Sequence, residues 1–151
     1  LGLVLDTDCA DLLDVEFFTA GEDLPDLIQR AHSAGVAVVC SSHDFCKTPP
    51  CAQLVDRMVR MQQAGADLPK VAVMPQSPAD VLELLAATAE MTEHHPDTPV
   101  ITMSMGALGA VSRLAGETFG SAMTFANPGH ASAPGQVPLD VVNGVLDALH
   151  L

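Results

Sequence analysis

Five short apolar runs typical of strands alternate along this chain with five longer stretches typical of helices, at a spacing of about thirty residues. Parallel strands need crossover connections, so this alternation predicts a parallel sheet covered by helices. The strand-like runs cover residues 12–17, 36–42, 68–74, 99–104 and 121–125. The helical stretches cover residues 24–34, 49–64, 78–94, 106–114 and 139–149.

Local signals mark several of the helix ends. Thr48 and Ser77 are each followed directly by proline, which predicts that they cap the helices that begin there. Gly35 and Gly65 follow the last residues of two helical stretches and predict their C-terminal ends.

The pattern alone is compatible with two architectures for such a sheet: a doubly wound open sheet and part of a (β/α)8 barrel. A complete barrel takes about 250 residues, so five units would make an incomplete one. No Gly-x-Gly-x-x-Gly motif follows the first strand, which argues against dinucleotide binding. Polar residues such as Glu16, His43 and Ser104 stand at the carboxyl ends of strands, where both architectures carry their active sites.

Composition narrows the class of protein. The 151 residues predict one domain, residues 1–151, with 48% hydrophobic residues to form its core. A formal net charge of −13 argues against binding of nucleic acid. No apolar run has the length of a membrane span, and we expect a cytoplasmic protein without a membrane partner. Because Leu1 is not a methionine, we expect a processed or partial product.

Four cysteines raise the question of a metal site. Cys40, His43, Cys46 and Cys51 are close in sequence. However, Cys40 and His43 are three residues apart on a predicted strand, so their side chains point to opposite faces. We therefore expect reduced cysteines and no metal site.

Lys70 is one of only two lysines and lies within the predicted strand 68–74. Burial in an apolar environment disfavours the charged form of a lysine, and an uncharged amine attacks carbonyl groups. Lys70 is therefore a candidate for forming a Schiff base. The alternative is a lysine whose head group reaches the surface or pairs with a carboxylate such as Asp67.

Two further residues accompany Lys70 as candidates. His43 ends the preceding strand, and consecutive strands of a parallel βα array are usually neighbours, so it can face the same pocket as a general acid and base. The alternative is a histidine that caps the next turn with Asp44. Arg113 is the only arginine in the last third of the chain and can bind an anion. Its alternative is a helical i,i+4 pair with Glu117.

Several motifs, in order along nearly the whole chain, resemble those of the type I 3-dehydroquinate dehydratases. The motifs are Ser42-His43-Asp44-Phe45 with Thr48-Pro49, Gly65-Ala66-Asp67, Lys70-Val71-Ala72-Val73-Met74-Pro75, Ile101-Thr102-Met103-Ser104-Met105-Gly106, Ser112-Arg113-Leu114-Ala115-Gly116-Glu117, Gly120-Ser121-Ala122 with Thr124-Phe125, and Ala131-Ser132-Ala133-Pro134-Gly135-Gln136. Each block alone is a modest signal, whereas the ordered series is specific.

The resemblance implies a (β/α)8 TIM barrel that converts 3-dehydroquinate to 3-dehydroshikimate in the shikimate pathway. By matching position, Lys70 would form the Schiff base and His43 would be the general acid and base. Arg113 would hold the substrate carboxylate, and Ser132 and Gln136 would belong to a loop that closes over the substrate. The resemblance implies no cofactor, and we expect a homodimer.

By the same resemblance, residues 1–151 would carry the last five βα units of the barrel. The first three strands, with part of the substrate-binding shell and a glutamate that orients the catalytic histidine, would precede Leu1. Two alternatives stay open beside the dehydratase. One is a class I aldolase, which also uses a lysine imine. The other is a non-catalytic partial barrel that self-associates through open sheet edges at residues 12–17 and 121–125.

Overall fold

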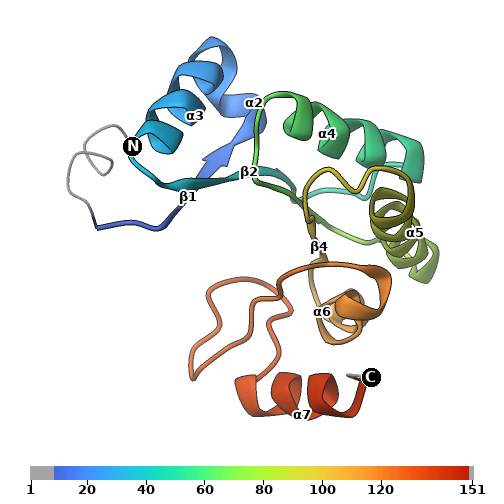
Figure 1. Cartoon of the computed structure of the whole chain (residues 1–151). Helices are drawn as coiled ribbons and strands as arrows, with labels where there is room; N and C mark the ends of the chain where they lie inside the picture. The colour runs from blue at the N-terminus through green and yellow to red at the C-terminus, as the bar shows by residue number, and fades with distance from the viewer. Residues whose placement is uncertain (1–8, 150–151) are drawn as a thin grey trace.

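The computed structural model describes residues 9–149 and shows strands alternating with helices along the chain (Figure 1). The strands are β1 (Leu12–Glu16), β2 (Ala37–Asp44), β3 (Leu68–Val73) and β4 (Ile101–Ser104). The helices are α2 (Phe17–Ala20), α3 (Leu24–Ser33), α4 (Cys51–Gln63), α5 (Pro78–His94), α6 (Ala110–Leu114) and α7 (Leu139–Leu149), with 3-10 turns η1 (Gly21–Asp23) and η2 (Gly116–Phe119). None of the helices in this part of the chain has the length and apolar composition that crossing a bilayer requires.

The sheet is parallel, as the alternation predicts, and its strand order β1-β2-β3-β4 follows the sequence without a reversal. A doubly wound sheet reverses its strand order and carries helices on both faces. Here β1–β4 lie side by side in sequence order, and α3, α4 and α5 follow one another around one side of the sheet (Figure 1). This arrangement is that of a (β/α)8 barrel whose sheet, within residues 9–149, does not close.

The two faces of the sheet have different partners. Alternate residues such as Val15, Val38 and Val71 belong to the large core that the sheet forms with α3, α4 and α5. The opposite face corresponds to the barrel interior, where Val39 and Met103 belong to a smaller apolar cluster. Along their strands, Lys70 and His43 are separated by an even number of positions from members of this smaller cluster. Their side chains therefore lie on the same, interior face.

The predicted fifth strand, residues 121–125, is wrong in extent. Only Ser121 pairs with the sheet, through an isolated parallel bridge to Val100, and Ala122 N–H donates to the Val100 carbonyl at 2.8 Å. The Thr102 N–H donates to the Ser121 hydroxyl at 3.0 Å, where a ladder would use a backbone carbonyl. A side chain thus takes the place of the ladder, and the described sheet has four strands where the sequence predicts five.

The two predicted caps have different outcomes. Ser77 is confirmed, because its side chain accepts from Asp80 N–H and the Asp80 carboxylate accepts from Ser77 N–H in a capping box. The cap predicted at Thr48 is wrong, because α4 begins at Cys51 and the Thr48 hydroxyl is buried without a hydrogen bond. The Cys51 N–H donates instead to the Glu83 carboxylate at 2.6 Å, so α5 supplies the group that satisfies the start of α4.

The helix predicted over residues 106–114 is shorter than expected, because α6 begins only at Ala110. Gly106 adopts a φ of 70°, which interrupts helical geometry directly after β4. The turn at Gly106 carries a second contact, since its N–H donates to the Pro134 carbonyl at 3.2 Å. The turn after β4 therefore supports the loop that contains residues 131–136.

Gly120 should be replaceable only at a large cost in stability. Its φ is 97° and a Cβ there would overlap the Thr92 side chain of α5, whereas Gly65 has the same φ of 97° and a Cβ there would only touch Ile28 at 3.4 Å. Gly65→Ala should cost about 1–2 kcal/mol for the left-handed backbone alone. Gly120→Ala should cost about 1–3 kcal/mol more, from overpacking, in urea unfolding followed by circular dichroism. Equal costs for the two variants would contradict this packing.

Gly135 should be required for the loop to rest on the turn after β4. A Cβ at Gly135, whose φ is 77°, would overlap the backbone of Gly106. Gly135→Ala should therefore break the hydrogen bond from Gly106 N–H to Pro134 and speed amide hydrogen exchange at Gly106. Gly35→Ala is the control, because Gly35 has a φ of 74° and open space around it. Unchanged exchange at Gly106 in the Gly135 variant would show that the loop does not depend on this approach.

Candidate active site

Lys70 lies in the middle of β3 with its side chain on the interior face of the sheet. The residue is 8% exposed, and its Nζ donates to Asp14 Oδ2 at 2.7 Å. The amine also lies over the ring of Phe125, 5.1 Å from the ring centroid. A carboxylate at this distance stabilises the ammonium form, as does the face of an aromatic ring. Attack on a carbonyl group therefore requires that a proton first leave Lys70.

The carboxylate partner of Lys70 is not Asp67, the candidate from the sequence. Asp67 lies at the start of β3, where it accepts from Val38 N–H at 2.7 Å and pairs with His32 Nε2 at 2.9 Å. Burial acts to raise the pKa of Asp67, but the hydrogen bonds from Val38 and His32 outweigh it and lower that pKa. Asp67 and Lys70 are three residues apart on a strand, so they point to opposite faces.

His43 is held in place by Glu16 of the neighbouring strand. The Glu16 Oε2 atom lies 2.7 Å from His43 Nδ1, and Oε1 accepts from the His43 backbone N–H at 3.1 Å. The ring also stacks on Phe45, with centroids 5.8 Å apart and an interplanar angle of 10°. A carboxylate that accepts from Nδ1–H leaves Nε2 as the nitrogen that can take a proton from a substrate.

Glu16 is a carboxylate partner of His43 that lies within the chain. The glutamate that the resemblance places before Leu1 lies outside this sequence and stays an expectation. Asp44, the alternative partner of His43, instead accepts from the backbone N–H groups of Cys46 and Lys47 at 3.0 Å each and forms the turn after β2.

Ser41 lies between the Lys70–Asp14 pair and the His43–Glu16 pair. Its hydroxyl lies 2.5 Å from Asp14 Oδ1 and 3.1 Å from Glu16 Oε2. The register explains the meeting, because Glu16 is paired with Ser41 and Ser41 with Lys70 across three adjacent strands. Ser41 is 1% exposed. The structure therefore joins Lys70 to His43 through a continuous series of contacts at hydrogen-bonding distance.

Arg113 is buried at 2% exposure within α6. Its Nη1 lies 3.5 Å from the Met103 sulfur and its Nη2 lies 3.4 Å from the Pro134 carbonyl, while Nε has no hydrogen bond. Burial lowers the pKa of Arg113. A guanidinium with such weak acceptors is well suited to an incoming anion.

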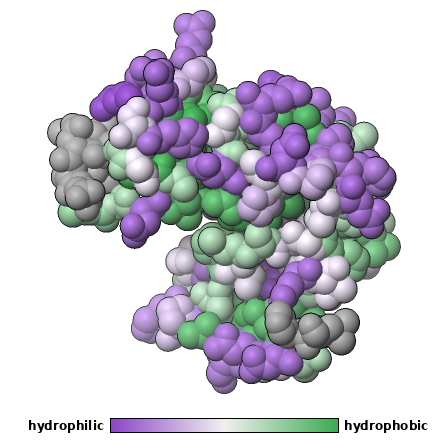
Figure 2. Space-filling model, in the orientation of Figure 1, coloured by the Kyte–Doolittle hydropathy of each residue, from purple (hydrophilic) through white to green (hydrophobic). Residues whose placement is uncertain are grey.

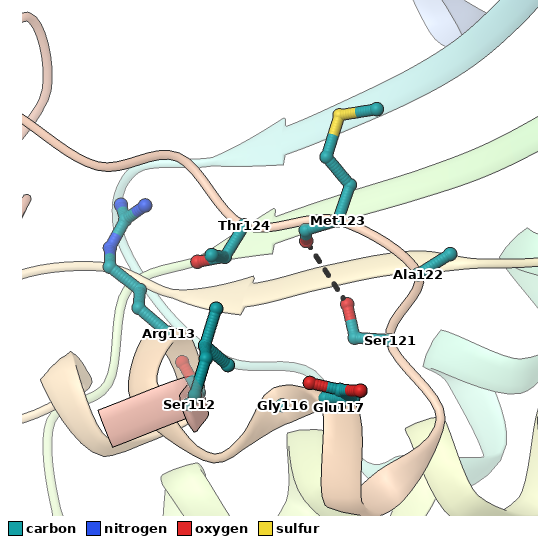
Figure 3. A pocket seen from close by; sticks show the side chains of 9 residues that line it. Ser112, Arg113, Gly116, Glu117, Ser121, Ala122, Met123 and Thr124 are labelled. Atoms are coloured by element: carbon teal, nitrogen blue, oxygen red, sulfur yellow. Dashed lines mark hydrogen bonds between the residues drawn. The ribbon is translucent and has the colours of Figure 1, made fainter. Parts of the chain in front are cut away.

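The alternative pair of Arg113 with Glu117 does not form. Figure 3 shows the guanidinium pointing away from the Glu117 carboxylate, across a cavity of about 230 Å³. The cavity lies between α6, η2 and α7, with Ser121 and Leu146 in its wall. Arg113 belongs to the lining of this cavity, whereas Lys70 and His43 do not.

Ser132 and Gln136 bind each other. Gln136 Oε1 accepts from Ser132 N–H at 2.6 Å, and Gln136 Nε2 donates to the Ser132 hydroxyl at 3.0 Å. Pro134, between them, accepts from Arg113. The structure thus brings Arg113, Ser132 and Gln136 together, and within residues 9–149 no hydrogen bond joins them to Lys70 or His43.

No group of three or more histidine, cysteine, aspartate or glutamate side chains in the described part of the chain is placed to hold a metal ion. Cys40 lies in the helix-side core, on the face opposite His43, as the alternation predicts. Burial, and then the charges of Asp14 and Glu16, raise the pKa of the Cys40 thiol to about 12.

The sequence reasoning missed two residues of the site, Asp14 and Phe125. A signal for Asp14 was available, because Asp14 and Glu16 alternate with Leu13 and Val15 and so share one strand face. No comparable local signal marked Phe125, which reaches Lys70 from the segment after the Ser121 bridge.

Comparison with known proteins identifies the family of this chain. A family model described as type I 3-dehydroquinase matches residues 1–151. The curated 3-dehydroquinate dehydratase of Salmonella typhimurium is 50% identical over 146 residues, which are 97% of this chain and 58% of that protein. This chain therefore spans 58% of the length of the curated relatives it matches.

Solved structures give the same result. A type I 3-dehydroquinate dehydratase from Clostridium difficile, with covalently modified comenic acid, has a TM-score of 0.94 and 49% identity over 99% of this chain and 59% of its own. The Geobacillus kaustophilus enzyme has a TM-score of 0.94 and 44% identity over 98% of this chain and 57% of its own. Sequence and fold agree, and the chain belongs to the type I 3-dehydroquinase family.

Proposed function

We propose that this chain is the Lys70- and His43-bearing part of a 3-dehydroquinate dehydratase. One observation carries the proposal: a buried lysine in the middle of β3 and a carboxylate-oriented histidine near the carboxyl end of the neighbouring β2 lie on one face of a parallel sheet. Family membership supports the dehydratase over the aldolase alternative. We further propose a single cytoplasmic domain, residues 1–151, that acts on a small molecule without a cofactor and does not bind nucleic acid.

The chemistry follows from the two side chains. After losing a proton, Lys70 attacks the C3 ketone of 3-dehydroquinate, and loss of water gives a protonated imine. This cation acidifies the adjacent C2 proton, because the electron pair left behind is delocalised as an enamine. His43 Nε2 removes that proton, and the resulting imidazolium protonates the C1 hydroxyl as it departs as water. Hydrolysis of the imine then frees Lys70 and 3-dehydroshikimate.

The substrate carboxylate is proposed to bind Arg113. Its guanidinium is buried, has one unpartnered N–H group and contacts only weak acceptors. Ser132 and Gln136 stand on the loop that already reaches Arg113 through Pro134, so they are proposed to close over the substrate. The mutual Ser132–Gln136 hydrogen bonds would then be exchanged for hydrogen bonds to the substrate.

We also propose that the chain self-associates, with a homodimer as its state in solution. Within residues 9–149, β1 pairs with a strand on one side only, and such an edge can pair with a strand of another chain. Figure 2 shows a hollow with apolar residues on its walls between the strands and the C-terminal helix. Light scattering that gives a monomer mass would contradict this part of the proposal.

Lys70 should be the residue that borohydride traps. Incubation of the chain with 3-dehydroquinate and sodium borohydride should reduce the imine to a stable secondary amine on Lys70, detected by peptide mass spectrometry. The other lysine, Lys47, is exposed and provides the matched control. Lys47→Met should leave trapping unchanged, and Lys70→Met should abolish it. An adduct that persists in Lys70→Met, or trapping on Lys47 alone, would refute the Schiff-base assignment.

Arg113 should bind the carboxylate through its paired donors. In a Lys70→Met background, which prevents turnover, Arg113→Lys should raise the dissociation constant for 3-dehydroquinate about tenfold or more, because a charge-assisted hydrogen bond contributes about 1.5–3 kcal/mol. Isothermal titration calorimetry measures this constant. Arg30→Lys, at an exposed position of α3, is the control and should leave it unchanged. Equal constants in both variants would remove Arg113 from the binding site.

A further inference from the structure

The Ser41 hydroxyl lies within hydrogen-bonding distance of two carboxylates but has only one hydrogen to donate. It lies 2.5 Å from Asp14 Oδ1 and 3.1 Å from Glu16 Oε2, and Ser41 itself is buried at 1% exposure. A serine hydroxyl donates one hydrogen bond, so it can fully satisfy only one of the two oxygens at a time. The shorter distance places that hydrogen on Asp14 in the structure.

Each carboxylate holds one residue of the proposed reaction. Asp14 Oδ2 accepts from Lys70 Nζ at 2.7 Å, and Glu16 Oε2 lies 2.7 Å from His43 Nδ1. The Glu16 oxygen that faces Ser41 is the same one that contacts His43. A second donor on that oxygen competes with the imidazole for its lone pairs and weakens its hold on a charged ring.

We propose that Ser41 is a positioning residue that couples the protonation state of Lys70 to that of His43. The proposal rests on the proposed function, because such a link matters only if both residues act on one substrate. It concerns hydrogen bonds within the chain, so it can be tested without turnover.

The step balances as a single proton transfer. Lys70 Nζ gives one proton to Asp14 Oδ2, which leaves a neutral amine with its lone pair and a neutral carboxylic acid. The remaining negative charge nearby is on Glu16, so the Ser41 hydrogen turns from Asp14 Oδ1 to Glu16 Oε2. Glu16 then stabilises an imidazolium less well, and His43 stays neutral, which is the form needed to remove the C2 proton.

The charged groups near His43 come from three strands. Glu16 and Asp14 belong to β1, Lys70 to β3, and Asp44 ends β2 itself, where its carboxylate is occupied by the turn. Any change of charge at Asp14 also reaches His43 directly through space. The experiment therefore has to separate the part of the effect that passes through Ser41.

A double-mutant cycle on the full chain makes that separation. The measured quantity is the titration midpoint of the His43 ring, followed by NMR of histidine-labelled protein and assigned with His43→Gln. Asp14→Asn imitates the protonated acid and should lower this midpoint by about 0.5–1 pH unit, the size expected for a typical intramolecular hydrogen bond. With Ser41→Ala also present, at least roughly half of that lowering should disappear.

Matched variants address folding and burial. Ser42→Ala removes a hydroxyl that is also buried, at 3% exposure, but from the opposite face of β2, and should leave the full effect of Asp14→Asn. Ser41→Cys keeps nearly the size of serine with a much weaker donor, so it should behave like Ser41→Ala and replaces it if the alanine variant does not fold. An effect of Asp14→Asn that is the same with and without the Ser41 hydroxyl would overturn the proposal.

Borohydride trapping separates this inference from the proposed function. Coupling that depends on Ser41 supports the inference even if 3-dehydroquinate is never trapped on Lys70, a result that refutes only the Schiff-base assignment. Trapping on Lys70 together with coupling that ignores Ser41 overturns the inference and leaves the Schiff-base assignment in place.

Discussion

The contact between Lys70 and Asp14 is the constraint on which the interior of this sheet depends. A lysine at 8% exposure on a strand is costly unless a carboxylate accompanies it, and Asp14 supplies that carboxylate at 2.7 Å from two strands away. The pair in turn fixes Ser41, which lies between the two charged strands. Polar side chains in this part of the interior are therefore held by one another, and none of them can be exchanged singly without leaving a partner unsatisfied.

The two faces of the sheet have different roles, and this difference allows the interior face to hold the charged side chains. The helix side is filled with aliphatic residues and carries most of the apolar burial. The interior face is free to hold charges, and its apolar cluster beside Met103 and Ile101 gives them a partly dry environment. The alternation of side chains along each strand decides whether a residue belongs to the helix-side core or to the interior face.

Much of this arrangement could be predicted from local pattern. The pairing of neighbouring parallel strands and the alternation of their side chains place Lys70 and His43 on one face. The identity of the carboxylate beside Lys70 could not be predicted in that way, because it depends on how far β1 is shifted along β2, and no local signal encodes that register. The strand predicted over residues 121–125 was wrong for a related reason. Strand propensity does not supply a pairing partner, and the Ser121 hydroxyl accepts the hydrogen bond from the Thr102 N–H.

Cys40 shows a consequence of placing carboxylates on an edge strand. A thiolate is a stronger nucleophile than an amine, so an ionised cysteine close to Lys70 would compete with it for electrophiles. With a pKa of about 12, only about one in 10⁵ of these thiols is ionised at neutral pH. Burial among the helix-side residues, helped by the charges of Asp14 and Glu16, thereby keeps the sulfur protonated on the face of the sheet opposite the amine.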